Sequence, residues 1–134
     1  MLKVALKTGD AALFDYLLER DAWLADERFG KALNKPLHIA CEYGHLPLVK
    51  KLIEFYQVEV NTVCPLSGYT PLMYAVQAGK LEVVRYLVTD VPFVDIMFKS
   101  TFSGRDALTI SKDAEFSRIT EFLLSKIPNL LPLP

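Results

Sequence analysis

The sequence predicts an all-α solenoid of antiparallel helix pairs joined by hairpin-like loops. Three observations predict it: a motif that recurs at shifts of 35, 35 and 36 residues, apolar residues at helical spacing, and proline and glycine at matching helix boundaries. Because such pairs stack on one another, the whole chain, residues 1–134, is expected to form a single domain.

Four copies of the motif can be aligned. Pro36–Leu46 aligns with Pro71–Leu81, and weaker copies begin at Met1 and Ala107. One position is leucine in every copy, and the position three residues later is always small. These residues are Leu2, Leu37, Leu72 and Leu108, and Ala5, Ala40, Ala75 and Ser111. The shared pattern predicts one packing role for each aligned position.

Each repeat is expected to contain a short inner helix followed by an outer helix. Pro36 and Pro71 suit the first turn of an inner helix, where the missing N–H costs nothing. Gly9, Gly44 and Gly79 can adopt the left-handed conformation that ends this helix and permits a tight reversal. The predicted repeats are about 1–34, 35–69, 70–105 and 106–127, followed by an apolar, proline-rich tail over 128–134.

The repeat resembles the ankyrin repeat. Thr70–Ala75 reads TPLMYA and Lys35–Ala40 reads KPLHIA, close to the ankyrin signature TPLHxA. Ala78–Leu87, AGKLEVVRYL, is similar to the usual continuation of that signature. The resemblance implies an ankyrin-repeat solenoid of L-shaped units, each with two antiparallel helices and a projecting loop. It also implies protein binding through the loop tips and the groove along the inner helices.

No repeat keeps both the threonine and the histidine of the signature, which normally bond each other near the start of the inner helix. Lys35 replaces the threonine, Met73 replaces the histidine, and Asp106 with Thr109 replaces both in the last repeat. Asp106 can still cap its helix by accepting backbone N–H bonds. Glu115 stands where glycine is expected, so the turn of the last repeat is the least well predicted.

Composition excludes several functional classes. The formal net charge of −1 and the scattered lysines and arginines argue against nucleic-acid binding, which needs a concentrated basic surface. No apolar run is long enough for a membrane span, and the N-terminal apolar stretch is too interrupted for a signal peptide. We therefore expect no membrane insertion and a cytoplasmic or nuclear location, including that of an effector secreted into a host cell.

No catalytic, cofactor-binding or metal-binding constellation is found in the sequence, which predicts a protein that is not an enzyme and carries no cofactor. His38 and His45 occupy positions at which ankyrin repeats commonly have histidine, and we expect them to bond neighbouring backbone. Cys41 is expected in the core and Cys64 on a loop, both reduced; a reactive Cys64 is the less favoured alternative.

Residues that follow each Leu-x-x-Ala pattern are expected to point off the core in rows along the inner helices. The rows are Val4, Ile39, Tyr74 and Ile110; Lys7, Glu42, Gln77 and Asp113; and Thr8, Tyr43, Ala78 and Ala114. Loop tips add Lys31, Leu66 and Phe102 and, nearer the helices, Asn34, Tyr69 and Arg105. The predicted partner-binding residues are Glu42, Tyr43, Tyr69, Tyr74, Gln77, Phe102, Arg105 and Asp113.

Three aromatic residues among these segments have competing interpretations. Tyrosine is enriched among interface hot spots, and we expect Tyr69 to face a partner. For Tyr74, packing between inner helices and contact with a partner are equally supported. Trp23 follows an outer helix, where burial is favoured over recognition.

The predicted function is therefore a non-catalytic module that binds a protein of unknown identity and is a monomer. One alternative is a structural spacer or oligomerisation module, because apolar residues stand at both ends of the repeat array. Another is a regulatory segment of a longer enzyme or channel.

We predict that amide hydrogens of the last repeat exchange with solvent faster than those of the two central repeats. This repeat has one neighbour and carries Glu115 at the glycine position, so its local opening is less costly. Hydrogen exchange followed by mass spectrometry measures the difference, and equal protection in all four repeats would contradict the prediction.

Overall fold

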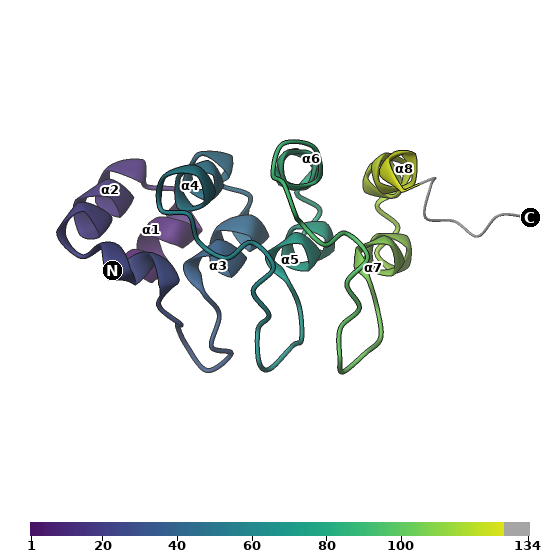
Figure 1. The fold of residues 1–134 in the computed structure, drawn as a ribbon, viewed down its shortest axis with the longest axis horizontal. Helices are drawn as coiled ribbons and strands as arrows, with labels where there is room; N and C mark the ends of the chain where they lie inside the picture. The colour runs from purple at the N-terminus through teal and green to yellow at the C-terminus, as the bar shows by residue number, and fades with distance from the viewer. Residues whose placement is uncertain (128–134) are drawn as a thin grey trace, which may run out of the picture.

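The chain folds into two layers of helices with a row of projecting hairpin loops (Figure 1). This computed structural model describes residues 1–127, so the predicted tail over 128–134 lies outside the described residues. The inner helices are α1 (Leu2–Thr8), α3 (Pro36–Tyr43), α5 (Pro71–Gln77) and α7 (Ala107–Asp113). The outer helices are α2 (Ala11–Arg20), α4 (Leu46–Lys50), α6 (Leu81–Thr89) and α8 (Ser117–Lys126).

The core runs along the stack between the two layers. Each inner helix contacts the next inner helix, from α1 through α3 and α5 to α7. The small residues predicted at the repeated position are fully buried. They are Ala5, Ala40, Ala75 and Ser111. Because these side chains are short, neighbouring helices can approach closely and bury a continuous apolar core.

Two segments break the regular pattern after an outer helix. Helix α4 continues into a π-helix over Lys51–Phe55, labelled η2, and α2 is followed by the 3-10 helix η1, Ala22–Asp26. Trp23 lies in η1 and is 63% exposed, so the expectation that it is buried is wrong. Its short helix presents the indole to solvent, and the buried residue of the segment is Ala25.

Three hairpin loops project from the inner layer, and we call them finger 1 (29–34), finger 2 (64–69) and finger 3 (100–105). Each is closed by a backbone bond between its first and last residues. In finger 1, Phe29 donates to the carbonyl of Asn34 at 2.7 Å; the corresponding N···O distance is 2.9 Å in the other two fingers. Leu33 has φ +58°, whereas the equivalent residues of fingers 2 and 3 are glycines. Finger 1 therefore holds a side chain in a conformation that favours glycine.

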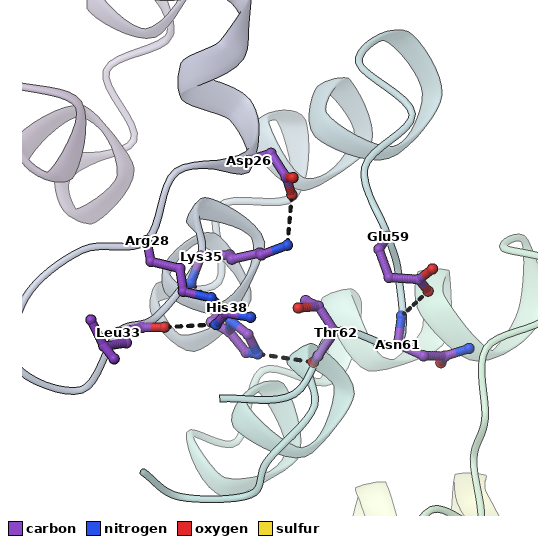
Figure 2. Close-up of polar contacts among 8 residues, drawn as sticks. All are labelled: Asp26, Arg28, Leu33, Lys35, His38, Glu59, Asn61 and Thr62. Carbon is purple, nitrogen blue, oxygen red and sulfur yellow. Dashed lines mark hydrogen bonds and ion pairs between the residues drawn. The ribbon is translucent and has the colours of Figure 1, made fainter. Parts of the chain in front are cut away.

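The inner helices begin with different caps, which satisfy different backbone N–H groups of the first turn. In α3 the N–H of Lys35 donates to Nδ1 of His38 at 3.0 Å, which leaves Nε2 to donate to the carbonyl of Thr62 at 3.1 Å (Figure 2). In α7 the carboxylate of Asp106 accepts the N–H of Thr109 at 2.8 Å. The structural roles predicted for His38 and Asp106 are confirmed.

The tight turn within each helix pair is covered by a side chain from the next pair. A Cβ added to Gly44 would lie 2.7 Å from Lys80, and one added to Gly79 would lie 3.1 Å from Phe116. Glu115 forms the same turn with φ +61°, although it is not glycine. Beyond α8 the described residues contain no helix pair that could cover it, so its Cβ has room but its backbone is strained.

The exposed face of the last helix pair is also polar. Lys112 is exposed, whereas its equivalents Leu6, Cys41 and Val76 are fully buried in the other pairs. Thr120 similarly stands where Val84 is buried, and its hydroxyl bonds the hydroxyl of Ser111 at 2.8 Å. None of the helices within residues 1–127 has the length and apolar character to cross a membrane.

Replacing Glu115 with glycine is expected to raise the free energy of unfolding by about 1 kcal/mol, because glycine adopts positive φ without the steric cost that other residues bear. Chemical denaturation measures the change. Glu115→Ala is the control and should leave stability nearly unchanged, since alanine keeps the Cβ. Equal stability of the glycine and alanine variants would contradict the explanation.

His38 is expected to make the fold less stable as pH falls from about 6.5 to about 4. Burial lowers the pKa of His38 to about 4, so the unfolded chain takes up a proton before the folded chain does. The linked loss reaches about 3 kcal/mol at most and stops below the folded pKa. Denaturation between pH 4 and pH 7 should show a shallower pH dependence of stability for His38→Gln than for the wild type, and equal slopes would contradict the prediction.

Candidate protein-binding surface

The inner helices and the fingers together form the surface on which the predicted binding residues lie. Gln77 and Asp113 are exposed at the C-terminal ends of α5 and α7, and Glu42 is half-buried at the end of α3. Tyr43 is exposed next to Glu42, and Phe102 is 69% exposed at the tip of finger 3. These five residues lie on the inner helices and on finger 3.

Tyr69 and Tyr74 are buried instead, with 8% and 9% of their surface exposed. The hydroxyl of Tyr74 bonds that of Ser67 at 2.9 Å, and its ring meets those of His38 and Tyr69 edge to face. Burial is the largest cause that raises the pKa of Tyr74, to about 12. These contacts make both tyrosines part of the connection between finger 2 and the helices, so we leave them out of the proposed surface.

The row that contains Tyr74 is likewise not a surface row. Ile39 and Ile110 are buried, whereas Val4 in α1 is 52% exposed. The expectation that this row points off the core is therefore wrong for three of its four members. At the equivalent position Tyr74 is covered by Ser67 and His38, which both precede it in the chain.

Arg105 and Asp113 are brought together at the far end of the surface. The guanidinium Nη2 of Arg105 lies 2.7 Å from Oδ2 of Asp113. Arg105 Nε has no hydrogen-bond partner among the described residues, and the same is true of Asn34 Oδ1 at the equivalent position of finger 1. Buried polar atoms are nearly always bonded, so these two atoms, at equivalent positions of two fingers, are exceptions to the rule.

Sequence reasoning missed one exposed apolar residue of the fingers. Leu33 is exposed in finger 1, where its carbonyl accepts a bond from Arg28 Nη1 at 2.9 Å (Figure 2). Leu66 is exposed in finger 2 and Phe102 in finger 3. A signal was present, because Leu33 aligns with Gly68 and Gly104 and so belongs to a finger tip.

A hollow of about 150 Å³ opens between finger 1 and the first two inner helices. Lys3 and Lys7 of α1 and Lys31 of finger 1 line it, together with Glu42 and Tyr43 of α3. The ammonium of Lys7 lies 5.8 Å from the centre of the Tyr43 ring. This end of the surface thus combines a recess, an aromatic ring and an excess of positive charge.

The second histidine and the two cysteines make contacts within the fold. His45 Nε2 lies 2.7 Å from the carbonyl of Lys7, as expected for a backbone contact. Cys41 and Cys64 are buried free thiols, and Cys64 Sγ donates to the carbonyl of Ala32 at 3.0 Å. Residues 1–127 contain no group of three His, Cys, Asp or Glu side chains placed to hold a metal ion.

Relatives of this chain are longer proteins that share its repeats. It is 35% identical over 133 residues to the "Probable E3 ubiquitin-protein ligase XBOS33" of Oryza sativa subsp. japonica. The alignment covers 96% of this chain and 24% of that protein. It is 29% identical over 111 residues to the "Ankyrin repeat and SAM domain-containing protein 6" of Mus musculus. That alignment covers 83% of this chain and 12% of the mouse protein. The chain therefore spans a quarter or less of these relatives.

A solved structure and a family model agree with this relationship. A chain in the crystal structure of the yeast ribosomal protein Rps3 in complex with its chaperone Yar1 superposes with a TM-score of 0.85 at 22% sequence identity, covering 99% of this chain and 94% of that one. This likeness shows the helical-repeat fold. The family model for ankyrin repeats (3 copies) matches residues 2–100. With its motif, helix pairs and fingers, the chain belongs to the ankyrin repeat family.

Proposed function

We propose that this protein is a non-catalytic module that binds a partner protein through its fingers and inner helices. The observation that carries the proposal is the exposure of Tyr43 at the end of an inner helix and of Leu66 and Phe102 on the fingers. Exposed aromatic and apolar residues framed by polar ones mark protein-binding surfaces. Gln77, Glu42 and the Arg105–Asp113 pair provide the polar surroundings.

We further propose that residues 1–134 act as one monomeric domain inside a cell, in the cytoplasm or nucleus or as an effector within a host. Two free cysteines that are both buried fit a reducing compartment. The near-neutral formal net charge of −1 supports a protein partner rather than nucleic acid, which calls for a strongly basic surface.

Substituting Tyr43, Leu66 and Phe102 together by alanine is expected to reduce partner capture at least tenfold. The three side chains are exposed, so each substitution should change stability by no more than about 0.5 kcal/mol. The measurement is affinity capture from cell extract with quantitative mass spectrometry, after light scattering has verified that the proteins are monomeric.

The matched control replaces Tyr16, Trp23 and Phe55, which are also exposed aromatic residues but lie in α2, η1 and η2, outside the fingers and inner helices. This variant should capture the same proteins as the wild type. If the triple variant of Tyr43, Leu66 and Phe102 remains folded and captures the same proteins in undiminished yield, the proposed surface is wrong.

A further inference from the structure

We propose that the hollow beside finger 1 receives a carboxylate side chain from an acidic segment of the partner protein. The inference rests on the proposed function, because it names the chemistry of the partner at one end of the same surface. An aspartate or glutamate of the partner would enter between Lys3, Lys7 and Lys31.

The charges that line the hollow are unbalanced. Three lysines face it and Glu42 is the one carboxylate among its lining residues. None of these four side chains takes part in the three ion pairs formed within residues 1–127. The whole chain has a formal net charge of −1, so the residues outside the hollow carry a net negative charge. The positive charge is therefore a local property of the hollow.

The lysines approach the hollow from two different elements. Lys3 Nζ lies 3.4 Å from the position that a Cβ on Gly30 would take, so its ammonium reaches finger 1 from α1. Lys7 lies over the Tyr43 ring, which holds its ammonium at the rim. Lys31 completes the site from the finger side. Convergent charges in a recess focus the electric field more strongly than the same charges spread over a flat surface.

The size of the hollow favours a side chain over a larger ligand. About 150 Å³ corresponds to roughly five water molecules, enough for the end of one acidic side chain. A nucleic-acid strand presents a row of phosphates and needs an extended basic surface. Here three lysines share one recess, and at the other end of the surface Arg105 is paired with Asp113.

The position of the hollow also orients the partner. Its acidic segment would lie over the first two helix pairs, and its apolar residues would meet Leu66 and Phe102 on fingers 2 and 3. Charge attraction at one end and apolar contact at the other set the direction of the partner segment along the surface. In the reverse direction the lysines would have no anionic partner.

The test is a titration of the isotope-labelled 134-residue chain, followed by amide chemical shifts. The probes are a 12-residue peptide of alternating glutamate and serine, its glutamine analogue, and a single-stranded DNA of 12 nucleotides. The glutamate peptide should shift the amides of Lys3, Lys7, Gly30, Lys31 and Tyr43 most strongly. Charge reversal by Lys3→Glu, Lys7→Glu and Lys31→Glu together should weaken its binding at least tenfold.

The matched control reverses three lysines elsewhere, Lys50→Glu, Lys99→Glu and Lys126→Glu, and so changes net charge by the same amount. It should retain binding within about threefold, as expected for screened charges distant from the site. Absence of shifts, equal binding of the glutamine analogue, tighter binding of the DNA, or equal loss in both triple variants would each overturn the proposal.

The same lysine variants separate this inference from the proposed function. If partner capture depends on Tyr43, Leu66 and Phe102 but not on Lys3, Lys7 and Lys31, the surface stands and the acidic contact is refuted. If capture depends on neither set, the proposed surface itself is refuted.

Discussion

The stack depends on how closely each helix pair approaches the tight turn of the pair before it. A Cβ on Gly9 would lie 2.6 Å from the ring of His45, whose Nε2 is 2.7 Å from the carbonyl of Lys7. The turn glycine therefore does two things at once: it reverses the chain, and it leaves space for the residue that bonds the neighbouring pair. These turns connect the inner helices to the outer ones. The contact between a turn and the next pair therefore also sets the distance between neighbouring fingers along the binding surface.

The architecture could be predicted because its determinants are local and repeated. A left-handed glycine, an N1 proline and a capping Asp106 are readable from a few adjacent residues, and the structure places each as expected. The turn at Glu115 was uncertain for the converse reason. Its positive φ is set by the reversal between α7 and α8, and glutamate as a residue type does not indicate that conformation.

The binding residues were less predictable, because exposure depends on which finger covers which helix. Tyr69 and Tyr74 share a face with candidate surface residues, yet the hydroxyl of Ser67 and the ring of His38 enclose the Tyr74 side chain. Trp23 shows the opposite error, since an indole usually buried is left in solvent by a short 3-10 helix. Both results depend on how distant segments pack against each other. An alignment of the repeats does not contain that information. Residues at the finger tips were easier to predict, because Leu66 and Phe102 lie on projecting loops and stay largely exposed.

The polar face of α7 and α8 determines how such an array can change in length during evolution. A copy of the helix pair that contains Gly79 and Val76, inserted between existing pairs, would meet compatible partners on both sides, because each internal pair presents the same glycine turn and apolar face. A pair stacked on α7–α8 in the same way would instead face Lys112 and the Cβ of Glu115, so several residues would have to change together. Internal duplication therefore adds a compatible helix pair in one step, whereas a pair stacked on α8 would need several substitutions.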